Sequence, residues 1–140
     1  MKVTIAAIGK MKDASPEAML LREYIKRLSW KITIKECKDD AGLLAACAGC
    51  EKLIALDERG RDMGSRELAA QFSAWQQQGI STLGIAIGGA GGLHKSVRDK
   101  AHLLLAFGRA TWPHMLVRAM LAEQLYRAST IMDGHPYHRD

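Results

Sequence analysis

The chain has 140 residues, 48% of them hydrophobic and 25% charged, which is the composition of an ordinary globular protein with one core. Its formal net charge of +5 suits a polyanionic partner such as nucleic acid, although many proteins of this charge have no such partner. No apolar run approaches the ~20 residues of a membrane helix, and the first residues do not resemble a signal peptide. We therefore expect one cytoplasmic domain over residues 1–140 and no membrane partner.

The first part of the chain predicts a strand, a helix and a second strand. Residues 2–9 form a β-rich run. The sequence Ser15-Pro16-Glu17 predicts a helix start, because serine caps helices, proline suits the first turn and an acid is favoured near the positive end of the dipole. Residues 31–35 alternate in polarity, as in a strand with one exposed face. We expect the helix to reach Leu28 and to bury these apolar side chains: Met19, Leu20, Ile25 and Leu28.

Helices and strands continue to alternate in the middle of the chain. Asp39 or Asp40 can cap a second helix through residues 43–50. The continuous apolar run at residues 53–56 indicates a strand that is buried on both faces. The polar residues 57–64 that follow it predict a loop.

The remaining elements complete the same pattern. Ser65 is expected to cap a helix that Gly79 ends, and residues 83–87 and 103–107 read as two further buried strands. Pro113 is expected to start a last helix that runs to about Met132. Strands that alternate with helices predict an α/β domain with a mostly parallel sheet covered on both faces.

A glycine cluster at residues 88–92 follows one of the buried strands. Ligands of open α/β sheets bind beyond the carboxyl ends of the strands, so this loop is a candidate binding site. It is not the dinucleotide motif G-x-G-x-x-G, because counting from Gly89 and Gly91 places the third glycine at His94. Two interpretations remain: a tight structural turn, or a closely bent backbone whose N–H groups bind a ligand.

The loop at residues 107–113 follows the next buried strand and begins at its carboxyl end. Pro113 presets a helix N-terminus, and the residues before it expose main-chain amides and the hydroxyl of Thr111. Beside the glycine cluster, this loop would form a pocket that reads an adenine or a carboxylate through main-chain groups. Trp112 is either a lid or part of the core, and the core is the slightly favoured interpretation.

The C-terminal sequence His135-Pro136-Tyr137-His138-Arg139 gathers groups that hold phosphate, stack on a base and move a proton. The alternative is a solvated tail without a role. Among the three cysteines, Cys47 and Cys50 have C-x-x-C spacing, but no second such pair completes a zinc site. We expect Cys47 and Cys50 to be structural thiols without a redox or metal-binding role.

Taken together, these motifs resemble the RlmH family of 23S rRNA (pseudouridine-N3)-methyltransferases in the SPOUT superfamily. The resemblance extends over essentially the whole chain, and its C-terminal part is highly specific. The chain looks short for this family, with the deficit around residues 37–50. The matching motifs are Ile8-Gly9-Lys10, Glu23-Tyr24-x-Lys26-Arg27, Ile54-Ala55-Leu56-Asp57, Ile87-Gly88-Gly89-x-x-Gly92-Leu93, Thr111-x-Pro113-His114-x-x-x-Arg118, Glu123-Gln124-Leu125-Tyr126-Arg127-Ala128 and His135-Pro136-Tyr137-His138.

The resemblance implies a SPOUT α/β-knot fold with a C-terminal trefoil knot, a homodimer, and S-adenosylmethionine as methyl donor without a metal. The acceptor it implies is N3 of a pseudouridine in helix 69 of 23S rRNA, modified on assembled 70S ribosomes. Recognition of the donor is expected to come from the backbone rather than from side chains. The implied donor-site residues are Leu56, Gly88, Phe107, Gly108, Arg109, Ala110, Thr111 and Trp112.

Methyl transfer requires alignment of donor and acceptor and loss of the N3 proton. We expect Arg127 to bind phosphate or an imide oxygen, Tyr137 to orient or stack the base, and His138 to bind the acceptor or relay the proton. An arginine-stabilised imidate that loses its proton to water fits equally well. The tail can also reach across a two-fold axis and complete the pocket of the other subunit.

Three other functions would each explain part of the sequence. A metal hydrolase would use His114, His135 and His138, but the last two flank a proline and Asp133 is the only nearby acid. A non-catalytic RNA-binding protein explains the charge and the tail, but not the two shaped loops. A thioredoxin-like redox role would rest on the C-x-x-C pair alone.

Overall fold

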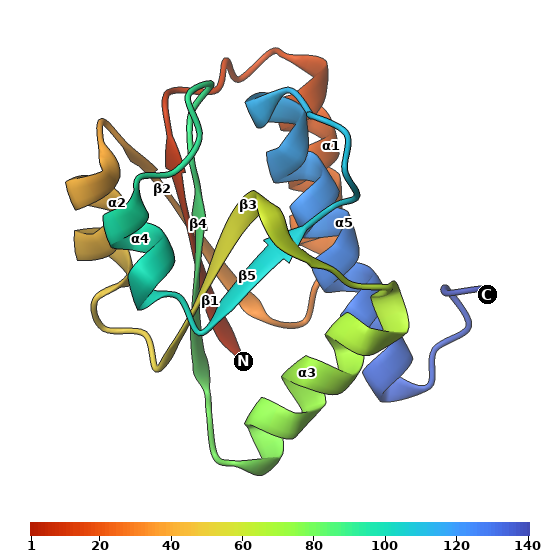
Figure 1. Ribbon diagram of the computed structural model, residues 1–140. Helices are drawn as coiled ribbons and strands as arrows, with labels where there is room; N and C mark the ends of the chain where they lie inside the picture. Colours follow the sequence, from red (N-terminus) through yellow and green to blue (C-terminus); the bar gives the residue numbers. More distant parts are fainter.

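The computed structural model describes residues 1–140 as five strands and five helices arranged around one sheet (Figure 1). Strands and helices alternate along most of the chain, as predicted. The elements are β1 (Lys2–Ile8), α1 (Pro16–Arg27), β2 (Lys31–Cys37), α2 (Asp40–Cys47), β3 (Lys52–Asp62), α3 (Ser65–Gln77), β4 (Thr82–Ile87), α4 (Lys95–Lys100), β5 (Leu103–Ala106) and α5 (His114–Asp133).

The sheet has the strand order β2-β1-β4-β3-β5, and every neighbouring pair is parallel. All carboxyl ends therefore lie at one edge, which Figure 1 shows at the top for β1 and β4. This arrangement confirms the predicted α/β class with a parallel sheet flanked by helices. The trefoil knot remains a prediction, because strand order alone does not define how the chain threads.

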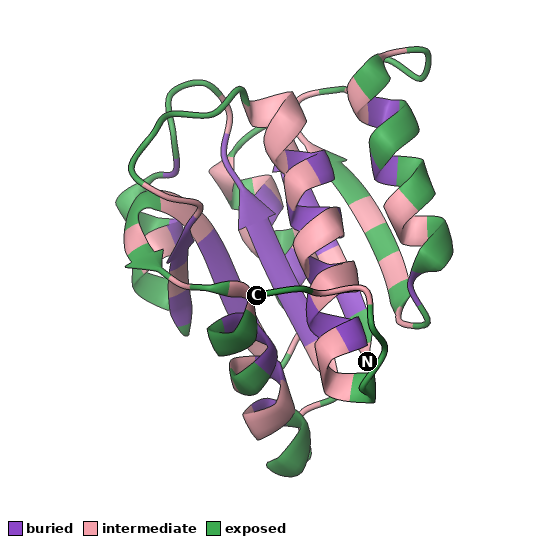
Figure 2. Cartoon of the chain, turned by 90° about the vertical axis from the view of Figure 1, so that its right-hand side faces the viewer, coloured by how far each residue is buried: buried purple, intermediate pink, exposed green.

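The two faces of the sheet carry different side chains. Ile5, Ile54 and Ile85 are in register on neighbouring strands and join the larger core, which α1, α3 and α5 cover. Ala6 and Ala55, in register across β4, face α2 and α4 in a smaller core. Figure 2 shows that buried residues concentrate in the central strands, whereas the edge strand β2 alternates between exposed and half-buried residues.

Local capping explains where the helices begin. The Ser15 hydroxyl accepts a hydrogen bond from the Ala18 amide at 3.2 Å, as predicted. Asp39 caps α2 by accepting from the Gly42 amide at 2.8 Å. The prediction for α3 was wrong by one residue: Ser65 is the first helical residue rather than the cap. Its neighbour Gly64 occupies the cap position and donates its amide to the Glu67 carboxylate at 3.2 Å.

Two further expectations were wrong. Met19 and Leu20 are 61% and 47% exposed, because they lie on the side of α1 that points away from the sheet. Residues 57–62 belong to strand β3 rather than to a loop. The chain stays extended there because it pairs with β5 a second time, after a register shift between Leu56 and Arg61.

The close approach at this register shift depends on a glycine. A Cβ on Gly60 would lie 2.6 Å from the carbonyl carbon of Leu104, which no side chain tolerates.

The last helix begins at His114, with Pro113 as its flanking residue, one position later than predicted. No helix of the structure is both long and apolar enough to cross a membrane.

Candidate functional site

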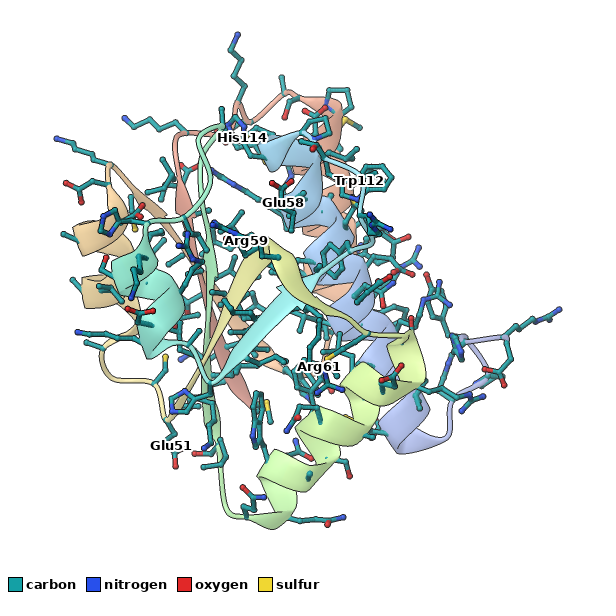
Figure 3. All side chains as sticks on the ribbon, in the orientation of Figure 1. Glu51, Glu58, Arg59, Arg61, Trp112 and His114 are labelled. Carbon is teal, nitrogen blue, oxygen red and sulfur yellow. The ribbon has the colours of Figure 1, made fainter.

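Residues 56–59 of β3 and the loops after β4 and β5 line a cavity of about 610 Å³ at the carboxyl edge of the sheet. This volume is in the range of small-molecule binding sites. In Figure 3, Glu58, Arg59, Trp112 and His114 lie toward this edge, and Glu51 lies at the opposite end of the sheet. Arg109 is exposed and does not line the cavity. The other seven predicted donor-site residues do line it: Leu56, Gly88, Phe107, Gly108, Ala110, Thr111 and Trp112.

The glycine loop forms a tight turn against the cavity. Gly89 and Gly92 form an isolated antiparallel bridge, and the Gly92 amide donates to the Gly89 carbonyl at 3.0 Å. A Cβ on Gly88 would lie 2.7 Å from the carbonyl carbon of Gly92. The interpretation as a tight turn that needs glycine is therefore confirmed. The unshielded backbone of this turn also lines the cavity, and binding of a ligand by its N–H groups stays a prediction.

The loop between β5 and α5 is held by its own backbone and by β3. The Gly108 amide donates to Asp62 Oδ1 at 3.2 Å, and the φ of Gly108 is +80°, in the left-handed region. Trp112 Nε1 donates to the Phe107 carbonyl at 2.8 Å. The prediction that Trp112 belongs to the core was wrong: its side chain lines the cavity and the residue is 43% exposed. The indole N–H is satisfied within the loop, so the ring needs no burial.

Ionisable side chains line the cavity beside these backbone groups. Arg59 donates from Nε and Nη2 to the two carboxylate oxygens of Asp57 at 2.9 and 3.0 Å. This hydrogen bonding holds the pKa of Asp57 below its usual value. Glu58 and His114 also line the cavity, and Glu58 Oε2 is 3.5 Å from the Thr111 hydroxyl. Asp57, Glu58 and Arg59 were not among the predicted site residues, although Asp57 and Glu58 directly follow the apolar part of β3.

The three predicted acceptor residues form a second cluster, at the carboxyl end of α5. Arg127 donates from Nη2 and Nε to Glu123 Oε1 at 2.6 and 3.0 Å. The Tyr137 hydroxyl donates to the same oxygen at 3.0 Å, and the Arg127 guanidinium lies 4.8 Å from the centre of the Tyr137 ring. The structure thus brings the three residues together, and it adds Glu123 as the group that holds them.

Both ring nitrogens of His138 have hydrogen-bond partners. Arg127 Nη1 lies 3.1 Å from Nδ1 of His138, and arginine can only donate, so Nδ1 accepts and carries no proton. The other ring nitrogen, Nε2, lies 3.0 Å from Asp140 Oδ1 and donates to it. Nδ1 is therefore occupied by Arg127 in this arrangement and becomes available to a substrate only when Arg127 turns away from it.

The tail is ordered rather than frayed. Asp140 receives two hydrogen bonds from Arg66 of α3, at 2.6 and 2.8 Å.

Burial, followed by hydrogen bonding to Tyr24 and Glu123, raises the pKa of Tyr137, so its phenol is a neutral donor at physiological pH. The sequence contained a signal for Glu123: an acid four residues before an arginine on a helix forms an ion pair.

The two clusters are separate within one chain. Roughly 20 Å of helix rise separates His114, at the start of α5, from Arg127. A second cavity of about 430 Å³ shares Phe107 and Gly108 with the first and reaches Glu123. Arg127, Tyr137 and His138 line neither cavity.

The rival chemistries find no support in the geometry. The structure gathers no group of three His, Cys, Asp or Glu side chains that could hold a metal ion. All three cysteines are free, and α2 ends at Cys47, so the predicted helix does not extend to Cys50. Burial raises the pKa of Cys47 to about 11, which leaves an unreactive thiol.

Comparisons with known proteins give a consistent family. A family model described as a predicted SPOUT methyltransferase matches residues 1–138. A protein of Paramagnetospirillum magneticum named ribosomal RNA large subunit methyltransferase H is 48% identical over 152 residues, covering 99% of each chain. Proteins of the same name from Novosphingobium aromaticivorans and Rhizorhabdus wittichii are 45% and 44% identical over 141 and 140 residues, covering 100% of this chain and 99% of theirs. Against these two relatives the chain is not short.

Solved structures agree on the fold. A structure described as a probable methylase family protein from Haemophilus influenzae Rd KW20 gives a TM-score of 0.68 at 12% identity, covering 99% of this chain and 70% of that chain. A probable methyltransferase from Bordetella pertussis Tohama I gives 0.62 at 14% identity, covering 90% and 95%. At these identities the likeness concerns the fold alone.

Proposed function

The chain belongs to the SPOUT methyltransferases and, within them, to the ribosomal RNA large subunit methyltransferase H family, and from this premise we propose a specific reaction. The protein transfers a methyl group from S-adenosylmethionine to N3 of a pseudouridine in helix 69 of 23S rRNA. Its substrate is the assembled 70S ribosome in the cytoplasm, and it acts as a homodimer.

One observation carries the proposal: three segments far apart in the sequence, in β3 and in the loops after β4 and β5, bring seven expected donor-site residues into one cavity. The backbone around Gly88 and residues 107–112 would hold the donor, as the glycine turn leaves room for main-chain contacts only. When bound, S-adenosylmethionine supplies an electrophilic methyl group on a positively charged sulfur. The chain's own residues supply alignment and the proton path.

On the acceptor side, N3 gives up its proton and bonds to the methyl carbon as the sulfur–methyl bond breaks. Arg127 stabilises the negative charge of the imidate or binds a phosphate. Tyr137, a neutral phenol, orients or stacks the base. His138 contacts the acceptor or accepts the proton at Nδ1, once Arg127 has turned from it toward the substrate. Proton loss to water, with Arg127 stabilising the imidate, is the alternative route.

A homodimer would complete each site. The acceptor residues line neither cavity of their own chain, so a partner's tail is the simplest source of them at the donor cavity. The large exposed apolar side chains, Met19, Leu20 and Trp112, lie on α1 and on the loop before α5, and these two helices pack together. A subunit interface would cover such exposed apolar side chains.

The direct test is transfer of a labelled methyl group from S-adenosylmethionine to ribosomes that lack the helix 69 methylation, with free 23S rRNA in parallel. We expect label on the assembled ribosomes, mapping to the pseudouridine. Absence of label on both substrates, together with no stoichiometric binding of S-adenosylmethionine, would instead favour a non-catalytic ribosome- or RNA-binding protein. Full single-turnover activity of His138→Ala on saturating ribosomes would exclude the relay role.

A further inference from the structure

The cavity proposed for the methyl donor contains one carboxylate whose charge no cation of the chain neutralises. Asp57, Glu58 and Arg59 are the charged side chains of its lining. Arg59 binds both oxygens of Asp57, so these two charges cancel. Glu58 forms no ion pair, and its carboxylate accepts one side-chain hydrogen bond, from the Thr111 hydroxyl at 3.5 Å. These three side chains therefore carry about one net negative charge, and Glu58 is the carboxylate among them without an ion-pair partner.

The proposed reaction changes the charge of the ligand in this cavity. S-adenosylmethionine carries a sulfonium, an ammonium and a carboxylate, and is a net cation. After the methyl group leaves, S-adenosylhomocysteine has a neutral thioether and no net charge. We propose that Glu58 makes the cavity selective for the cationic donor over its neutral product. This inference rests on the proposed function, since it assumes that the donor binds in this cavity.

Position and exposure set the size of the effect. Glu58 is exposed at the end of the cavity where β3 faces the loop before α5, so solvent screens its field until a ligand covers it. A single charge interaction of this partly screened kind changes binding by about three- to tenfold. Such a preference favours release of product and renewed donor binding. Asp57 cannot supply it, because Arg59 occupies both of its oxygens.

Calorimetric binding of three ligands to the wild-type chain and to Glu58→Gln tests the inference. The ligands are S-adenosylmethionine, S-adenosylhomocysteine and sinefungin, an unreactive analogue that carries an ammonium group near the position of the sulfonium. We expect Glu58→Gln to weaken the two cationic ligands about three- to tenfold and to leave the neutral product unchanged. Added salt should reduce the wild-type preference.

Equal weakening of all three ligands would overturn the inference, since the carboxylate would then contact a shared part such as the ribose hydroxyls. No change in any ligand would also overturn it. Glu58→Asp keeps the charge and should keep the preference. Glu51→Gln removes a carboxylate at the opposite end of the sheet and should alter no affinity (Figure 3). If the wild-type chain bound none of the ligands, the donor site itself would be wrong. If the wild-type chain bound the donor and Glu58→Gln kept the wild-type preference for the cationic ligands, only the role of Glu58 would be refuted.

Discussion

A buried arginine in α5 connects the last helix to the first two strands. Arg118 is only 1% exposed, and its guanidinium donates to the carbonyls of Ile8 and Gly9 at 2.8 Å and to Glu36 Oε2 at 2.7 Å. Replacement by methionine keeps the apolar bulk but leaves these acceptors without their donor. We expect Arg118→Met to lower the free energy of unfolding by about 3 kcal/mol, measured by urea denaturation.

The partner carboxylate gives the control and a pH signature. Donation from the Met11 amide, and then from Arg118, holds the pKa of Glu36 below its usual value of 4.5. A group with a lowered folded-state pKa stabilises above its unfolded pKa and loses that contribution as pH falls through the folded one. Glu36→Gln should therefore destabilise at neutral pH by less than Arg118→Met, and should flatten the loss of stability below about pH 4.5. Identical acid profiles for wild type and variant would contradict this account.

The buried thiol of α2 should be inert. Cys47 is 5% exposed, and burial raises its pKa to about 11, so the thiol stays protonated at pH 8. We expect a chromogenic disulfide reagent to titrate at most the half-buried Cys37 and Cys50 in the native chain, and all three thiols in denaturant. Reaction of three thiols under native conditions, or loss of methyl transfer in a Cys47→Ser, Cys50→Ser variant, would revive the redox hypothesis.

At the scale of elements, the glycine turn after β4 can be tested with a matched pair of substitutions. A Cβ at Gly88 would collide with the backbone of Gly92 at 2.7 Å, whereas a Cβ at Gly91 meets nothing within 4 Å. We expect Gly88→Ala to deform the turn and weaken S-adenosylmethionine binding by at least about tenfold, and Gly91→Ala to bind normally. Calorimetry measures both, and thermal unfolding shows whether each variant is folded. Equal affinities would mean that this turn does not shape the donor cavity.

The elements that the sequence predicted well are those with local signals. Ser15 and Asp39 mark helix starts because their side chains bond to amides only three residues away. The extension of β3 through residues 57–62 has no such signal, since its polar pattern is that of a loop and only pairing with β5 keeps it extended. The exposure of Trp112 is equally non-local, because it depends on a cavity between loops.

The candidate site likewise has parts that local sequence motifs indicate and parts that depend on contacts between distant segments. The family motifs located the glycine turn and the tail residues, and the structure places them in two groups. The role of Glu123 as common acceptor for Arg127 and Tyr137 depends on the tail folding back over α5, which no spacing encodes. The contact of His138 with Arg127 likewise depends on the tail folding back onto the helix.

For the whole molecule, the separation of the two clusters makes subunit complementation decisive. One variant, Ala110→Trp, fills the donor cavity from an exposed lining position and leaves the tail intact. The other is a chain ending at Gly134, which lacks Tyr137 and His138 but keeps the cavity. Each homodimer should be inactive in methyl transfer.

Mixed dimers of these two variants distinguish a cavity that is completed by the partner's tail from one that uses the tail of its own chain. If a cavity is completed by the partner's tail, each mixed dimer contains one doubly defective site and one fully intact site. An equal mixture, with half of its dimers mixed, should then recover about a quarter of the wild-type rate. If a cavity uses the tail of its own chain, every site carries one defect and the mixture stays inactive. Because the acceptor residues line neither cavity of their own chain, we expect recovery, measured as labelled methyl transfer to ribosomes after co-refolding.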